Sequence, residues 1–192
     1  MSGTAPLVGV LALQGGVVEH VDALERCGAR TRLVRTAAAF DGLDALVLPG
    51  GESTTMTLGM ERDGLTVPVR DFLRSGRPVL ATCAGLILLD RDHLDVLPIR
   101  CARNAFGRQT RSFEADLTIE GLEEPFPTVF IRAPQVVEHD EASVTVTSRV
   151  DGIVVGVRSG PIEGWAFHPE LSGDDRIHAR FVDRVAAGRR KA

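Results

Sequence analysis

Short apolar runs alternate with amphipathic stretches along the first half of the chain. The runs predict strands at residues 7–13, 31–34, 43–48 and 79–82. Between them apolar residues recur at helical spacing, and Gly28 and Gly76 are placed to end two helices. The continuous apolar run at 43–48 is typical of a strand that is covered on both faces. Strands separated by helices predict a mostly parallel sheet with helices on both faces.

The second half of the chain has a different pattern. Closely spaced β-rich runs lie at 117–119, 129–131, 144–150 and 153–157. We interpret them as antiparallel additions to the sheet. A last helix is predicted at 174–187, ended by Gly188. Its apolar face is formed by Ile177, Phe181, Val182 and Val185. The predicted fold is therefore α/β and flavodoxin-like, with its ligand site at the carboxyl ends of the strands.

Length and composition indicate one globular domain over 1–192, with its core at about 7–187. The 192 residues are 44% hydrophobic and 25% charged, and no repeat or linker divides them. Lys and Arg total 22 against 26 Asp and Glu, for a net charge of −4. That balance argues against nucleic acid as a partner. The first apolar run has no basic segment before it and is too short to span a bilayer, so we expect a soluble cytoplasmic protein without membrane contact.

The sharpest local signal surrounds Cys83. An apolar strand leads directly into this cysteine, small residues flank it, and a helical run from Leu86 follows. This is the strand-turn-helix context of a nucleophile elbow, in which a tight turn lifts the sulfur clear of the backbone and the helix start favours thiolate. A buried structural cysteine is the alternative. Cys27 and Cys101 lack the context and are predicted to be structural; three scattered cysteines indicate a reducing interior.

A second signal is the run His168-Pro169-Glu170 after an apolar stretch. Pro169 favours extended backbone at His168, and side chains two residues apart in extended chain point the same way. Glu170 can then orient one ring nitrogen of His168 while the other faces a nucleophile. The remaining histidines are interpreted as surface or core residues: His20, His93, His139 and His178. A cysteine elbow together with this run predicts nucleophilic catalysis.

A glycine-rich turn, PGGEST, follows the strand predicted at 43–48. Gly50 and Gly51 let backbone N–H groups approach a ligand closely, and such groups can stabilise an oxyanion. The alternative is an ordinary loop before a helix that Ser53 or Thr54 caps. The turn is not a Walker loop, because no Gly-Lys-Ser/Thr follows it.

Several segments together carry a family resemblance that covers roughly residues 7–185. They are LALQGG, LPGGESTTM, TCAGLILL, ARNAFGRQTRSFEADL, VFIRAP, and FHPEL followed by DDRIH. The chain resembles the glutaminase subunits of pyridoxal 5′-phosphate synthase, which are class I glutamine amidotransferases. The cysteine elbow and His-x-Glu fit many amidotransferases, whereas RNAFGRQ, SFEADL and FIRAP narrow the match.

The resemblance implies a role for each matching residue. Cys83 is implied as the nucleophile, His168 as general base and acid, and Glu170 as its orienting carboxylate. The implied glutamine-binding positions are Gly51, Glu52, Ser53, Arg103, Ile131 and Arg132. Arginines beside polar and backbone groups suit the α-carboxylate and α-ammonium of glutamine. The oxyanion donors are expected at Gly50, Gly51 and Ala84.

The resemblance also implies a partner. In this family, glutamine is hydrolysed to glutamate and ammonia, and the ammonia passes through a tunnel to a barrel-shaped synthase subunit, whose docking activates the glutaminase. No cofactor is expected, and neither the histidine spacings nor the cysteines form a metal site. Three alternatives stay open: service to another acceptor enzyme, a stand-alone cysteine hydrolase, and an interaction subunit that has lost or impaired its chemistry.

Two departures from the family pattern affect the expected pocket. Ala81 stands where relatives usually have glycine, two residues before the nucleophile, and adds a methyl group beneath the elbow. The connection at 90–102 is shorter than usual. Both changes concern the shape of the pocket rim more than the reaction type.

Overall fold

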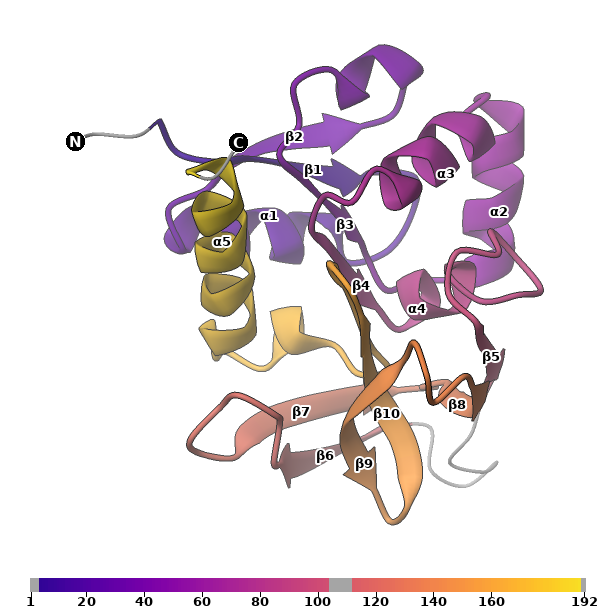
Figure 1. The fold of residues 1–192 in the computed structure, drawn as a ribbon, viewed down its shortest axis with the longest axis vertical. Helices are drawn as coiled ribbons and strands as arrows, with labels where there is room; N and C mark the ends of the chain where they lie inside the picture. Colours follow the sequence, from indigo (N-terminus) through magenta and orange to yellow (C-terminus); the bar gives the residue numbers. More distant parts are fainter. Residues whose placement is uncertain (1–3, 104–111, 191–192) are drawn as a thin grey trace.

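The computed structural model describes residues 4–103 and 112–190 (Figure 1). A nine-stranded mixed sheet lies at its centre, in the order β2-β1-β3-β4-β11-β10-β8-β5, with β9 paired to β10 outside this path. The predicted α/β class is confirmed.

The parallel part of the sheet corresponds to the four strands predicted in the first half. They are β1 (Leu7–Leu11), β2 (Arg30–Val34), β3 (Ala45–Leu48) and β4 (Val79–Thr82). A fifth strand, β11 (Ile162–Trp165), pairs in parallel with β4 although it lies far along the chain. Strands β3, β4 and β11 are buried along their whole length, as helices on both faces require.

Helices cover the two faces of this parallel part. The α-helices are α1 (Val17–Arg26), α2 (Ser53–Arg62), α3 (Thr66–Arg74), α4 (Ala84–Leu88) and α5 (Arg176–Arg189). Short 3₁₀ turns are η1 (Ala37–Phe40) and η2 (Pro169–Leu171). In Figure 1, α1 and α5 lie together on one side of the strands, and α2, α3 and α4 lie on the other.

The predicted end of the last helix is wrong. Helix α5 passes through Gly188 and ends at Arg189, while its predicted apolar face is buried. The guanidinium of Arg189 donates to the Thr4 carbonyl at 2.7 Å and lies 3.3 Å from Asp44. These contacts hold the last turn, and the φ of Gly188 is not left-handed, so this glycine does not end the helix.

The antiparallel additions are confirmed in part. Four strands join the sheet in antiparallel pairs: β5 (Ile99–Ala102), β8 (Gln135–His139), β9 (Thr145–Val150) and β10 (Ile153–Ser159). The runs predicted at 117–119 and 129–131 do not join it. Leu117 is the last residue of β6 (Ser112–Leu117), while Thr118 and Ile119 lie in no strand, and the second run ends β7 (Phe126–Ile131). Strands β6 and β7 form a separate two-stranded sheet. Phe130 packs edge-on against Phe167, and this contact places the ribbon against the exit of β11.

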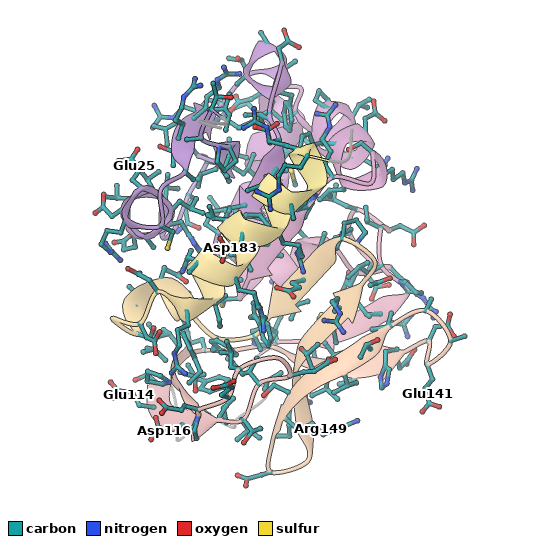
Figure 2. All side chains as sticks on the ribbon, turned by 60° about the vertical axis from the view of Figure 1, so that its left-hand side comes forward. Glu25, Glu114, Asp116, Glu141, Arg149 and Asp183 are labelled. Atoms are coloured by element: carbon teal, nitrogen blue, oxygen red, sulfur yellow. The ribbon has the colours of Figure 1, made fainter. Side chains whose placement is uncertain are left out.

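Apolar side chains fill the space between the sheet and its covering helices, with Trp165 and Phe167 fully buried at the centre. The charged residues labelled in Figure 2 are all exposed: Glu25, Glu114, Asp116, Glu141, Arg149 and Asp183. None of the helices in the described part of the chain has the length and apolar character that crossing a bilayer requires.

Candidate active site

A cavity of about 400 Å³ opens at the carboxyl ends of the parallel strands, where the fold predicts a ligand site. Ten of its lining residues were expected from the sequence: Gly50, Gly51, Glu52, Ser53, Cys83, Arg103, Ile131, Arg132, His168 and Glu170. Ala84, the remaining expected residue, is buried directly beside Cys83 at the start of α4. Gln14, Gly15, Gly16 and Glu19 also line the cavity and were not predicted.

Cys83 occupies the predicted elbow between β4 and α4. Its backbone has φ 46° and ψ −105°, a strained conformation for a residue with a side chain. The Cys83 N–H donates to the Trp165 carbonyl at 2.7 Å, which ties the elbow to β11. Behind it, a Cβ on Gly85 would lie 2.1 Å from the Leu48 carbonyl oxygen, so only glycine fits. The strained turn points to a position held for function rather than for packing.

The fold accommodates Ala81, which departs from the family pattern. Ala81 is fully buried in β4 and pairs with Gly164 of β11. Side chains of paired residues lie on the same face of a sheet, and Gly164 has none. The space above Gly164 is filled by Leu86, whose Cδ1 lies 2.5 Å from where a Cβ would stand. The methyl group of Ala81 is therefore part of a packed layer beneath the elbow.

The shorter connection at 90–102 is organised around the buried carboxylate of Asp90. Its Oδ1 accepts from the Asp92 N–H at 3.0 Å and contacts His93 Nδ1 at 2.7 Å. Its Oδ2 accepts from the Cys101 N–H at 3.1 Å, at β5. The Asp90 carboxylate thus ties the start of this connection to β5, which leads to the cavity rim at Arg103.

His168 and Glu170 form the expected pair, but through a different backbone path. His168 Nδ1 and Glu170 Oε1 lie 2.7 Å apart. The prediction of extended chain through both residues is wrong, because Glu170 lies in the 3₁₀ turn η2, which Pro169 begins. The His168 N–H donates to the Val129 carbonyl of β7 at 2.8 Å and fixes the start of the turn.

The other face of His168 is turned to Cys83 across Gly50. A Cβ on Gly50 would lie 2.4 Å from His168 Cε1 and 3.1 Å from Cys83 Cβ. Burial lowers the pKa of His168, but hydrogen bonds to Cys83 and Glu170 outweigh it and raise the pKa to about 10. Burial raises the pKa of Glu170, but the combined effect of the neighbouring His20 and His168 is larger and holds this pKa below its usual range. At neutral pH the imidazole beside the sulfur is therefore cationic.

The sequence interpretation missed that His20 lies beside the carboxylate of Glu170. His20 and His178 are fully buried, as core histidines would be, yet His20 Nε2 lies 3.3 Å from Glu170 Oε2. A signal was present: His20 falls on the buried face of its helix with Ala23 and Leu24, close to a helix start that borders the cavity. The other two histidines predicted to be structural, His93 and His139, are not among the cavity's lining residues.

The glycine turn after β3 packs directly on the turn after β1. The Gly16 N–H donates to the Gly50 carbonyl at 3.0 Å, and a Cβ on Gly15 would overlap that carbonyl oxygen. Because the peptide is trans, the Gly51 N–H points away from the Gly50 carbonyl. Gln14 Oε1 accepts from the Glu52 N–H at 2.6 Å. The LALQGG segment thus sets the orientation of the candidate oxyanion turn.

The cavity rim is held by Glu52 and Arg103. The Glu52 carboxylate accepts from the N–H of Thr54 at 3.3 Å and of Thr55 at 2.8 Å, so Glu52, not Ser53 or Thr54, caps α2. These bonds, the one from Thr55 above all, lower the pKa of Glu52. Arg103 donates to Thr54 Oγ1 at 3.1 Å and lies 3.8 Å from Glu52. The RNAFGRQ segment continues from here, and its residues 104–109 lie outside the described residues.

Ile131 and Arg132 border the cavity from β7. The Ile131 carbonyl lies 3.9 Å from Cys83 Sγ, and Arg132 follows with a left-handed φ of 45°. Ala84 begins α4 beside the sulfur, and N–H groups in the first turn of a helix have no partner within it. These positions can present backbone and guanidinium groups around a bound amino acid.

A cysteine on a strained elbow, a buried histidine–carboxylate pair and a glycine turn, all at strand ends of an α/β sheet, define the class of cysteine-dependent amidohydrolases. The chain belongs to the SNO glutamine amidotransferase family, whose model matches residues 10–187.

Named relatives cover nearly the whole chain. It is 47% identical over 188 residues to the pyridoxal 5′-phosphate synthase subunit PdxT of Corynebacterium jeikeium, covering 93% of this chain and 96% of the relative. Identity to the PdxT subunit of Bacillus pumilus is 46% over 185 residues, covering 93% and 94%. A crystal structure of a glutamine amidotransferase matches with a TM-score of 0.86 at 41% identity, covering 96% of this chain and all of that one. The structure of PurLQS from Thermotoga maritima, at 19% identity and a TM-score of 0.73 over 97% and 99%, shares the fold.

Proposed function

We propose that this chain is the glutaminase subunit of a pyridoxal 5′-phosphate synthase. It hydrolyses L-glutamine to L-glutamate and ammonia and delivers the ammonia to a synthase subunit. The observation that carries the chemistry is Cys83 on a strained elbow, facing a histidine that Glu170 orients at 2.7 Å. Membership of the glutamine amidotransferase family and relatives named as synthase subunits support the substrate and the pathway.

In the first half of the reaction, the Cys83 thiolate attacks the side-chain carboxamide carbon of glutamine. Backbone N–H groups of the Gly50-Gly51 turn and of Ala84 stabilise the oxyanion. The imidazolium of His168 then gives its proton to the departing nitrogen, ammonia leaves, and a glutamyl thioester remains on Cys83.

In the second half, neutral His168 takes a proton from water, and the hydroxide attacks the thioester carbonyl at the same oxyanion site. Collapse of this intermediate releases glutamate and returns the thiolate and the imidazolium to their starting states. Glu170 keeps its charge throughout and stabilises the imidazolium.

The rim residues bind the amino-acid end of glutamine. Arg103 and Arg132 supply cationic donors for the α-carboxylate. Glu52 and the backbone at Gly51 and Ile131 supply acceptors for the α-ammonium, and Ser53 closes the end of the turn. The carboxylate of Glu52 already caps α2, so its remaining lone pairs are held in a fixed direction.

The proposed partner is a barrel-shaped synthase subunit that accepts ammonia, and the glutaminase is one domain without a cofactor of its own. The test is a glutamate-release assay with and without a candidate synthase subunit, in wild type and in Cys83→Ala. We expect release that depends on Cys83 and rises with the partner. Release that needs no Cys83 would refute the mechanism; activation only by a different acceptor enzyme would refute the assignment to this synthase.

A further inference from the structure

A buried line of polar side chains continues behind Glu170, away from the cavity. His20 Nδ1 and His178 Nε2 lie 2.9 Å apart, and His20 Nε2 lies 3.0 Å from Thr82 Oγ1 and 3.3 Å from Glu170 Oε2. His20, Thr82 and His178 are fully buried. His20 comes from α1 and His178 from α5, the two helices that lie together in Figure 1. These residues stand between the triad carboxylate and the protein core.

The ring protons of His20 and His178 can be arranged in two ways, which differ in the buried groups that they leave without a hydrogen-bond partner. If His178 Nε2 donates to His20 Nδ1, then His20 Nε2–H is donated to Thr82 Oγ1 and also faces Glu170 Oε2, which lies 3.3 Å from Nε2 and accepts no hydrogen bond from the described residues. This arrangement leaves His178 Nδ1 as a bare acceptor, in agreement with the absence of a partner for that atom among the described residues. The reverse arrangement buries an N–H on His178 Nδ1 without an acceptor and turns a bare ring nitrogen of His20 toward the buried carboxylate oxygen. Unpaired buried donors and charges cost more than a bare ring nitrogen, so the first arrangement is favoured.

We propose that His20 is a positioning residue of the triad: its Nε2–H, hydrogen-bonded to Thr82 Oγ1, also faces Glu170 Oε2 at an Nε2–Oε2 distance of 3.3 Å and attracts it, so that Oε1 stays aimed at His168. The inference rests on the proposed function, because Glu170 matters to turnover only if the triad does. His20 touches neither substrate nor Cys83 and acts through the carboxylate. His178 acts one step further back and fixes the tautomer of His20.

A neutral donor suits this place better than a cation would. Burial lowers the pKa of His20 against the attraction of Glu170, and burial lowers that of His178 to about 3. Both rings are therefore neutral at neutral pH. A neutral N–H orients the carboxylate without neutralising it, and the charge of Glu170 stays available to the imidazolium of His168.

The test compares His20→Leu with His20→Gln in the glutaminase–synthase complex. Leucine fills the space without a donor, whereas the glutamine amide can place an N–H near the position of Nε2. We expect kcat to fall at least tenfold in His20→Leu with KM changed by less than about twofold, and to return to within about threefold of wild type in His20→Gln. His139→Leu is the control, because it removes a histidine that does not line the cavity; we expect wild-type kcat.

A folded His20→Leu variant with wild-type kcat would overturn the proposal, as would equal losses in both variants, which would indicate packing alone. A second measurement needs no variant: long-range ¹H–¹⁵N spectra of the wild-type chain report histidine tautomers. We expect the proton of His20 on Nε2, and a proton on Nδ1 would overturn the proposal. If wild type released no glutamate with the synthase, the proposed function would fail, while the spectrum would still decide the contact.

Discussion

The proposed triad and the proposed glutamine-binding rim are neighbours in one cavity and are built in opposite ways. Cys83, His168 and Glu170 are exposed by less than a tenth, and short contacts join them to strands β4, β7 and β11. Glu52 and Arg103 are nearly half exposed and are held by a helix cap and an ion pair of 3.8 Å. Buried hydrogen-bonded groups keep one geometry, whereas exposed ion pairs contribute little and adapt easily. Changes in the triad should therefore lower turnover, and changes at the rim should weaken binding.

The largest effect is expected for Cys83→Ala. Loss of the nucleophile should reduce glutamate release by about a thousandfold or more and leave the fold intact, because the change is small. Cys27→Ala and Cys101→Ala should keep most activity, since neither thiol lines the cavity. Glutamate formed by the activated complex is the measurement. Substantial turnover in Cys83→Ala would refute the triad.

The partners of the nucleophile should show the next largest losses. Glu170→Gln keeps a hydrogen-bonding group but removes the charge that stabilises the imidazolium, so kcat should fall by about a hundredfold with little change in KM. His168→Asn should be worse, since no base remains. Steady-state kinetics in the complex measure both variants, and near-wild-type kcat in both would assign the base to another residue.

Between triad and rim lies the glycine turn, where we expect control by the partner. The Gly50 carbonyl is held by the Gly16 N–H, and reversing this peptide would exchange an oxyanion donor for a repelling carbonyl. The free chain should bind glutamine but turn it over slowly, and the synthase should raise turnover at least tenfold, about 1.4 kcal/mol of barrier.

Gly51→Ala sharpens this prediction. The added Cβ would stand 2.4 Å from Gln14 Oε1, the end of a flexible side chain, so the fold should survive while activation weakens. Titrating the synthase subunit into each variant measures the activation. A free wild-type chain that is already as fast as the complex would refute control by the turn and leave the triad untouched.

At the rim, Arg103→Ala should raise KM for glutamine several-fold and change kcat by less than about twofold, since we propose that the arginine binds the α-carboxylate of glutamine and not the reacting carbon. Arg149→Ala is a suitable control, because Arg149 is exposed and its guanidinium binds only a carbonyl of its own turn among the contacts of the described chain. A fall in kcat without a rise in KM would place Arg103 with the triad instead.

The smallest effect is a pH-dependent stability difference. The pKa of His168 is raised from 6.5 to about 10 in the folded chain, so its stabilising interactions are complete below about pH 6.5 and are lost as pH rises through 10. Glu170→Gln removes part of this interaction. The Tm gap between wild type and Glu170→Gln should be largest near pH 6 and shrink toward pH 10. A gap that widens with pH would contradict the cationic His168.

The sequence pattern located those features of the molecule that are formed by residues close together in the chain. A strand, small residues and a helix start within ten positions were enough to locate the elbow at Cys83, and the His168-Pro169-Glu170 run was enough to pair the histidine with its carboxylate. The 3₁₀ geometry at Glu170 was not predicted, because proline restricts the residue before it but does not choose the path after it.

The parts that were missed depend on contacts between distant segments. His20 and His178 are separated by 158 positions and meet only because α1 packs on α5. The sequence of the β6–β7 ribbon alternates apolar and polar residues as strands of the main sheet do, so the pattern alone could not show that the ribbon is separate. Its position depends on the packing of Phe130 against Phe167. Gln14 belongs to the site because its side chain contacts Glu52, which lies 38 positions further along the chain.

The central claim is that Cys83 is the one nucleophile of a preformed triad. It is tested most directly with a glutamine analogue that carries a chloromethyl ketone in place of the carboxamide, since the attacking thiolate displaces chloride and keeps the label. Peptide mapping of the treated complex should find the label on Cys83, with glutaminase activity lost in proportion and protection by glutamine. Loss of activity with the label on Cys27, Cys101 or another residue, and Cys83 unmodified, would contradict the account.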